Sequence, residues 1–285
     1  MGPLPKNFCG RLDEAGFGRI QVWDFGFRSL QREYARLFFL GAVVAHPLKA
    51  ARGIRRYRQF IRDNKGGTAG YSRFVSLPDE AVFLERARAR GRGPLVGLGF
   101  CLKPLDSTDP SRSCPSGRPN HDCLFFERRE PRPACSDCAI REIGSRALEA
   151  GCPVYIMTSA KDIARDFMLL QIRRGVFPAA ALVLCPYSVQ VIIPPLLICG
   201  VDLLLLPYSA GSCADYEQWL RADRGIKDER TTIDGESKER LLGLLAGLNA
   251  GAGAGTRSRR FERRGNVFFP VQKKTGDGPA LFNGK

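Results

Sequence analysis

Cysteine is the residue type in this chain whose number and spacing indicate a chemical role. Five of the ten cysteines lie between Cys101 and Cys138, in a stretch that also holds His121, one of two histidines. Cys135 and Cys138 form a C-x-x-C pair, a spacing that lets two thiolates from one turn bind one metal ion. The stretch is rich in proline, serine and aspartate. Since such a segment packs little core, metal binding could supply the folding free energy that it lacks.

Four cysteines of this stretch are the predicted metal ligands, and they are Cys114, Cys123, Cys135 and Cys138. His121 is an alternative ligand, although a polar loop residue is the simpler interpretation. Cys152 and Cys199 stand beside apolar residues, so we interpret them as ordinary buried cysteines. No role is assigned to Cys9.

Short apolar runs alternate with helical patterns from residue 94 onward. The runs show no polar alternation, as expected for strands that are covered on both faces. This pattern predicts an α/β fold with an open, mostly parallel sheet of about four strands and helices on both faces. The expected strands are Leu95–Phe100, Val154–Met157, Ala180–Leu184 and Val201–Leu206, and the expected helices are Asp79–Arg90, Cys138–Ala150, Ala160–Arg174, Val189–Ile198 and Glu236–Leu248.

Three further cysteines follow expected strands. Cys101 and Cys185 each end a strand, and Cys213 comes shortly after the last one. Ligands of open parallel sheets bind beside the carboxyl ends of the strands, so we predict that Cys101, Cys185 and Cys213 bind a cofactor there. Because the stretch from Cys101 to Cys138 leaves from the same edge, all seven cysteines are expected to converge.

The number of cysteines favours an iron–sulfur cluster over zinc. A structural zinc site needs four ligands, and seven convergent cysteines exceed that number. Proline follows Cys114 and Cys185, as it follows ligating cysteines in ferredoxin-type sequences. Zinc remains the alternative. The chain has no glycine-rich dinucleotide fingerprint, no phosphate-binding P-loop and no nucleophile elbow at a strand end.

The order of these motifs resembles the domain-of-unknown-function family 116 of bacteria and archaea. The residues that carry the resemblance are Cys101-Leu102-Lys103, Cys114-Pro115, Cys135-Ser-Asp-Cys138-Ala-Ile140, Cys185 and Gly211-Ser-Cys213. The loop from Arg118 to Pro133 and both ends of the chain depart from the family pattern. The resemblance covers roughly residues 94–220 and implies a cysteine-rich α/β domain that binds a metal or a cluster, with no activity to carry over.

Three regions are predicted: a helical, basic N-terminal region at 1–93, the cysteine-rich α/β domain at 94–248, and a flexible basic tail at 249–285. The net charge is +15, and both ends are rich in Lys and Arg. Basic ends favour an anionic partner, although they could serve solubility alone. The basic amphipathic stretch Leu48–Ile61, part of a helical pattern over Ser29–Asn64, is expected to pack on the protein itself.

Neither a signal peptide nor a transmembrane segment is expected, because the apolar stretches are short or interrupted by proline. We therefore expect a cytoplasmic protein with reduced cysteines, a setting in which clustered cysteines indicate metal binding or catalysis. The leading hypothesis is a cysteine-ligated metal-binding protein, iron–sulfur in type, with a redox or electron-transfer role and a redox partner. The alternatives are a zinc-stabilised binding module and a nucleic-acid-associated basic protein. The sequence names neither a substrate nor a reaction.

Overall fold

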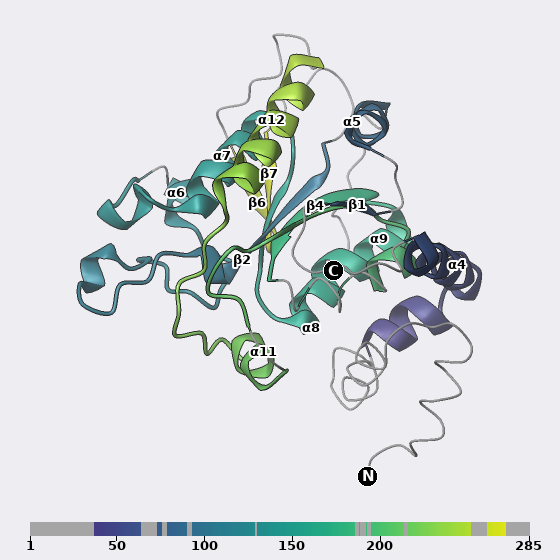
Figure 1. Cartoon of the computed structure of the whole chain (residues 1–285), viewed down its shortest axis with the longest axis horizontal. Coiled ribbons are helices and arrows are strands. Elements are labelled where there is room, and N and C mark those ends of the chain that lie inside the picture. The colour runs from purple at the N-terminus through teal and green to yellow at the C-terminus, as the bar shows by residue number, and fades with distance from the viewer. Residues whose placement is uncertain are drawn as a thin grey trace.

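The fold is built on one seven-stranded sheet with the strand order β1-β5-β4-β2-β3-β7-β6 (Figure 1). The computed structural model describes residues 37–63, 73–75, 79–89, 93–128, 130–185, 188, 192, 195–213, 216–251 and 261–271, and the structural statements below concern these residues.

Four parallel strands form the centre of the sheet, and they are β2 (Leu95–Gly99), β3 (Val154–Met157), β4 (Ala179–Leu184) and β5 (Asp202–Pro207). β2 pairs in parallel with both β3 and β4, and β4 pairs in parallel with β5. The predicted α/β class and parallel strands are confirmed, with bounds that differ by no more than one residue. These strands were predictable because both faces are buried, which requires continuous apolar runs.

The sheet is larger than the four strands expected from the sequence. β1 (Arg73–Val75) pairs antiparallel with β5 at one edge. A hairpin of β6 (Phe261–Arg264) and β7 (Val267–Pro270) pairs antiparallel with β3 at the other edge. Its turn is Gly265-Asn266, where Gly265 has a φ of +59°, a left-handed conformation that glycine adopts without steric cost.

The hairpin corrects the expectation of a flexible tail for residues 261–270. Val267 and Phe268 are only 3% and 1% exposed, and β7 is hydrogen-bonded to β3. This part of the predicted tail is therefore integral to the sheet and the core. The remaining tail residues lie largely outside the described part of the chain.

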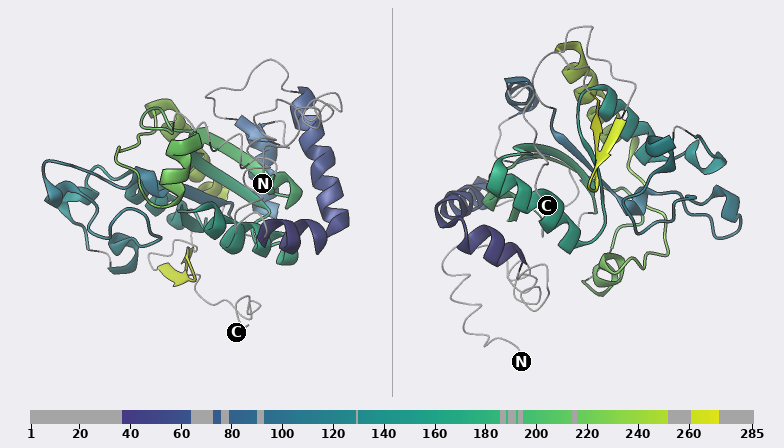
Figure 2. Two further views of the ribbon diagram at one scale, coloured as in Figure 1. Left: turned by 90° about the horizontal axis from the view of Figure 1, so that it is seen from below. Right: turned by 180° about the vertical axis from the view of Figure 1, so that it is seen from behind.

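Helices cover both faces of the sheet, as predicted (Figures 1 and 2). Alternate strand residues such as Val96 and Leu98 pack with α5, α7 and α12 on one face. The intervening residues, such as Leu95 and Tyr155, pack with α8 to α9 and with residues 196–199 on the other face. The helix bounds are α5 Glu80–Ala89, α6 Leu124–Arg128, α7 Ala139–Glu149, α8 Ala160–Ile163, α9 Leu169–Arg174, α11 Tyr216–Asp223 and α12 Gly235–Gly251, with a π-helical segment, Ala164–Met168, joining α8 to α9.

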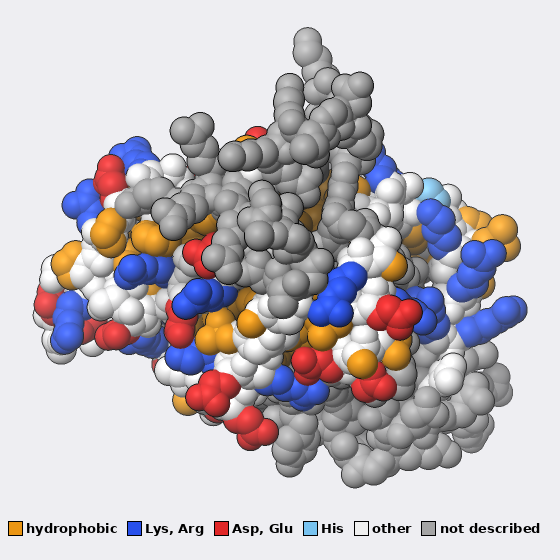
Figure 3. Space-filling model, turned by 90° about the horizontal axis from the view of Figure 1, so that it is seen from above, with side chains coloured by type: hydrophobic (Ala, Val, Ile, Leu, Met, Phe, Trp, Pro, Cys, Tyr) orange, Lys and Arg blue, Asp and Glu red, His pale blue; other side chains and the backbone are white. Residues whose placement is uncertain are grey.

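Helix α4 (Pro47–Asp63) follows the π-helical segment Phe39–Val44 and packs on the protein, as predicted. Ala50 is 2% exposed, and Gly53 lies so close to residue Ile198 that a Cβ atom would come within 2.2 Å of its Cα. α4 also carries exposed basic residues, at positions 49, 52, 55 and 56, of which Lys49 donates to the Ile172 carbonyl and Arg56 pairs with Asp202. Figure 3 shows basic side chains at the right-hand end of the molecule, where α4 lies. Among the described helices, none is both long and apolar enough to cross a bilayer.

Candidate metal centre

The four predicted metal ligands surround one small cavity. Cys114, Cys123, Cys135 and Cys138 all line a space of about 20 Å³ beside the start of α7. They come from three separate places in the loop that links β2 to α7, so the fold brings the residues together. The cavity walls are completed mostly by apolar atoms, and Lys103, Asp122 and Arg141 are the charged residues among them.

Backbone N–H groups at two helix starts face the sulfurs of this cavity. Cys138 is the N-cap of α7 and stands beside the backbone N–H groups of Ile140 and Arg141, although its side chain makes no capping hydrogen bond. Cys123 stands directly before α6, beside the backbone N–H groups of Phe125 and Phe126. Burial raises the pKa of Cys123 to about 12 and also raises the pKa of Cys138, while these N–H groups act in the opposite direction. A bound cation is therefore what would keep both sulfurs as thiolates.

Lys103 contributes a buried positive charge to the same cavity. The residue is 2% exposed, and its Nζ donates to the Gly117 carbonyl at 2.9 Å and to Asn120 Oδ1 at 2.6 Å. Both acceptors are uncharged. Burial lowers the pKa of Lys103, whereas negative charge on Cys114 and Cys123 would raise it. Because a buried ammonium is costly unless negative charge lies near it, the cavity suits an anionic occupant such as a metal group ligated by four thiolates.

The sulfurs of this cavity are spread more widely than zinc requires. Within the described part of the chain, no three cysteine sulfurs lie within 4.8 Å of one another. In a tetrahedral zinc site with Zn–S bonds of about 2.3 Å, the sulfurs would be about 3.8 Å apart. The residue types fit a cysteine-ligated group.

A second, larger cavity of about 120 Å³ lies at the carboxyl ends of the four parallel strands. Cys101, Cys185 and Cys213, the three predicted cofactor ligands, line it together. The wall is mostly apolar and includes the aromatic rings of Tyr208 and Trp219. A cavity at this position is what the general rule for open parallel sheets predicts.

The seven cysteines form two groups in the described residues instead of the single group that we expected. The division arises because the chain turns away from the sheet edge directly after Cys101 and carries the other four cysteines to the start of α7. Arg118 bridges these regions. It donates to the backbone oxygens of Cys101 at 3.0 Å and Glu229 at 2.8 Å, and its charge also acts on Cys114.

Hydrogen bonds polarise Cys185 in the larger cavity. The Cys213 side chain is the largest influence on its pKa, and Ser188 donates two hydrogen bonds to its sulfur, from Oγ at 2.9 Å and from the backbone N–H at 3.2 Å. Together they lower the pKa of Cys185 to about 6. The same interaction and burial raise the pKa of Cys213, and burial raises that of Cys101 to about 11. Cys185 is therefore the thiolate of this group.

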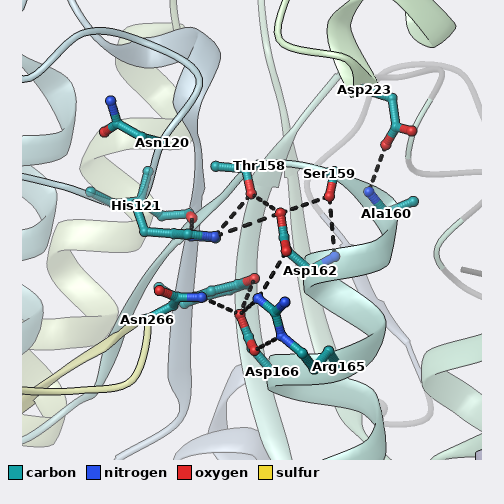
Figure 4. A network of polar contacts seen from close by, with 12 residues as sticks. Asn120, His121, Thr158, Ser159, Ala160, Asp162, Arg165, Asp166, Asp223 and Asn266 are labelled. Carbon is teal, nitrogen blue, oxygen red and sulfur yellow. Dashed lines mark hydrogen bonds and ion pairs between the residues drawn. The ribbon is translucent and has the colours of Figure 1, made fainter. Parts of the chain in front are cut away.

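His121 lines neither of the two cysteine cavities. Its Nδ1 is 2.8 Å from the Ile156 carbonyl, which can only accept, so Nδ1 is the donor. Its Nε2 faces Thr158 Oγ1 at 3.1 Å and Asp162 Oδ2 at 3.7 Å (Figure 4). The ring stacks on Tyr155. The interpretation of His121 as a polar loop residue fits this position better than a ligand role.

A cluster of His121, Asp162 and Asp166 has ligand atoms within 4.8 Å of one another. Arg165, however, already binds both carboxylates, Asp162 at 2.9 Å and Asp166 at 2.7 Å (Figure 4). Asn266 of the hairpin donates to Asp166 at 2.7 Å. Because Arg165 already binds both carboxylates, we interpret the cluster as a network that ties α8 to the loop and the hairpin.

The sequence assigned no role of their own to Lys103 and Ser188. Lys103 stood out only as part of the Cys101-Leu102-Lys103 motif, because a lone lysine after an apolar run is also typical of the first exposed residue of a loop. Ser188 had a usable signal, since a hydroxyl three residues after Cys185 is placed to cap a following turn. Cys152 and Cys199 are 0% and 4% exposed, which confirms them as buried, and Cys9 lies outside the described residues.

Comparison of the chain with known protein families, with curated proteins and with solved structures gives no match. The resemblance to the domain-of-unknown-function family 116 therefore stays an expectation from motifs.

Proposed function

We propose that this chain is a cysteine-ligated metal-binding protein in which Cys114, Cys123, Cys135 and Cys138 hold an iron–sulfur cluster with a redox or electron-transfer role. The observation that carries the proposal is that four cysteines from three places in the sequence line one cavity together with the buried ammonium of Lys103.

The sulfur spacing supports a cluster. Sulfurs that do not gather within 4.8 Å suit a group of several metal atoms better than one tetrahedral ion. When bound, a cluster supplies one-electron chemistry. The chain's own contribution would be electrostatic: Lys103 and the N–H groups at the starts of α6 and α7 stabilise negative charge on the sulfurs, which favours the reduced state.

Zinc is the second candidate, and one observation favours it. The cavity holds four cysteines, the number that a structural zinc site uses, and its volume of about 20 Å³ is close to that of a single water-sized atom. In that case the site would stabilise the long loop between β2 and α7 and carry no electrons.

Metal analysis of anaerobically purified protein tests the proposal. We expect iron and acid-labile sulfide with broad visible absorption, and loss of most of both in the single Cys→Ala variants at 114, 123, 135 and 138. The buried cysteines provide matched controls, because Cys152→Ala and Cys199→Ala should keep the metal. A triple Cys→Ala variant at 101, 185 and 213 should also keep it. Stoichiometric zinc without colour would establish the second candidate, and metal content unaffected by all four ligand variants would refute both.

A further inference from the structure

We propose that Cys185 and Cys213 form a redox-active dithiol that exchanges with a small aliphatic disulfide bound in the 120 Å³ cavity. This inference goes beyond the metal centre, since it concerns a different cavity and different cysteines.

The fold brings these two thiols to one cavity. Cys185 directly follows β4, and Cys213 lies in the loop after β5, the strand that pairs with β4 up to Leu184 and Pro207. Gly211 allows that loop to turn back, because its φ is +69° and an added Cβ would lie 2.3 Å from the carbonyl oxygen of Arg230. Both side chains therefore line the 120 Å³ cavity, and each influences the pKa of the other.

A series of hydrogen bonds that ends at the Cys185 sulfur identifies Cys185, and not Cys213, as the attacking cysteine. The indole N–H of Trp219 can only donate, and it reaches Ser188 Oγ at 3.1 Å. Ser188 Oγ is therefore the acceptor in the bond with Trp219. Its own hydroxyl proton can then be donated to the Cys185 sulfur, which lies 2.9 Å from Oγ. Cys185 therefore receives charge-stabilising hydrogen bonds from the hydroxyl and the backbone N–H of Ser188, as an attacking thiolate requires.

The cavity selects the kind of disulfide. Its volume of about 120 Å³ approaches that of an apolar cavity of about 150 Å³ that accepts benzene, so an aliphatic arm of a few heavy atoms fits. Met157 and Ile163 line it beside the aromatic rings. Its charged residues have other partners, because Asp223 accepts from the Ala160 N–H at 2.6 Å and Lys227 pairs with Glu229 at 2.5 Å. Charged arms would therefore find no free counter-ion.

The exchange has two steps. The Cys185 thiolate attacks one sulfur of R–S–S–R, which forms a Cys185–S–S–R bond and expels one RS⁻. Cys213 then loses its proton, which the released RS⁻ takes up, and attacks the Cys185 sulfur, expelling the second RS⁻, which takes a proton from water. The protein dithiol loses two electrons and becomes a disulfide, and the substrate disulfide gains them and becomes two thiols.

The test uses anaerobically purified full-length protein with its metal retained and bis(2-hydroxyethyl) disulfide as the probe. Wild-type protein should release two 2-mercaptoethanol molecules per chain and show a Cys185–Cys213 disulfide by peptide mapping. Cys213→Ser should stop at a hydroxyethylthio adduct on Cys185 with one thiol released. Cys185→Ser should react at least tenfold more slowly at pH 7. Cys152→Ser and Cys199→Ser should behave as wild type, and oxidised glutathione, which is large and charged, should react at least tenfold more slowly than the probe.

Three results would overturn the inference. They are a wild-type protein that does not react, a mapped disulfide that does not join Cys185 to Cys213, and a Cys185→Ser variant as fast as wild type. Equal rates with oxidised glutathione would refute the role of the cavity. The mapping needs no variant, so a substitution that unfolds the chain does not decide the outcome. Metal content measured on the same samples keeps this test separate from that of the metal centre, since the Cys185 and Cys213 variants should retain the metal.

Discussion

Lys103 Nζ lies 2.6 Å from Asn120 Oδ1, and the same oxygen accepts the backbone N–H of Asp122 at 2.9 Å. The buried ammonium thus fixes the chain immediately before Cys123, one of the four cysteines that line the small cavity. Lys103 both shapes the loop and places a positive charge beside the sulfurs.

We predict that Lys103→Met weakens metal retention. The substitution removes the buried charge and leaves the Gly117 carbonyl and Asn120 Oδ1 without their donor, which should lower the free energy of unfolding by about 1–3 kcal/mol. The loss should be larger in metal-loaded than in metal-free protein, because only the loaded cavity is anionic. Chemical denaturation of both forms measures this difference. Lys238→Met, at a more exposed lysine paired with Glu142, is the control, and equal losses in both forms would contradict the electrostatic role.

The C-terminal hairpin should contribute strongly to stability through Phe268. This ring is 1% exposed and packs against Phe126 with a centroid distance of 5.3 Å. Phe268→Ala should therefore lower the free energy of unfolding by about 3–5 kcal/mol. Its neighbour Phe269 points to the other face and is only partly buried, so Phe269→Ala should cost much less, about 1 kcal/mol. Urea denaturation of the two variants tests the ranking, and equal costs would argue against hairpin docking through Phe268.

Gly99 is predicted to be required where β2 meets the larger cavity. A Cβ at this position would lie 1.9 Å from the Tyr208 hydroxyl, so Gly99→Ala must displace the tyrosine from the cavity wall. We expect a loss of about 1–3 kcal/mol in the free energy of unfolding. Gly243→Ala is the matched control, because α12 has open space there, and it should stabilise the protein by about 0.5–1 kcal/mol. Denaturation curves that show Gly99→Ala to be neutral would mean that Tyr208 is free to move.

The Asp162 network should make stability depend on pH in the acid range. Burial alone would raise the pKa of Asp162, but hydrogen bonds from Ser159 and Thr158 and the charges of His121 and Arg165 lower it below its usual 3.8. A carboxylate whose pKa is lowered by folding adds stability above its unfolded pKa, and that contribution disappears as the pH falls through the folded value.

Asp162→Asn should therefore lower the free energy of unfolding by about 1 kcal/mol at pH 7, an amount limited by the partial exposure of the site. The gap from wild type should close below about pH 4. Unfolding followed across the pH range measures the gap. Asp228→Asn, at a 76% exposed carboxylate, should show little effect at any pH. A gap that persists unchanged in acid would show that the charge of Asp162 is not the cause.

The central strands could be predicted from the sequence because a strand that is buried on both faces has a recognisable pattern, a short apolar run bounded by glycine, proline or polar residues. The edge strands have no such pattern. β1 has three residues, and β6 is mostly charged. The Gly265-Asn266 pair between two aromatic segments was a usable hairpin signal, but the surrounding basic composition suggested a tail.

The cysteine cavities also combine features that the sequence could predict with features that it could not. The rule that ligands bind at the carboxyl ends of parallel strands brought Cys101, Cys185 and Cys213 to one cavity, and spacing alone singled out Cys135 and Cys138. The separation into two cavities depends on the path of a loop with little periodicity. That path is fixed by contacts between residues far apart in the sequence, such as those of Arg118 with the backbone of Lys227 and Glu229. Such contacts cannot be predicted from a local sequence pattern.

The pairing of β7 with β3 sets an order of events during synthesis. β3 is complete at Met157, but the strand that covers its outer edge begins at Val267, about 110 residues later. At a translation rate of about 5–20 residues per second, the nascent chain carries this open edge for roughly 6 to 22 s. An unpaired edge of a hydrophobic strand is a template for pairing with other chains. Ribosome-bound chains that end before the hairpin should therefore be the species most in need of a chaperone.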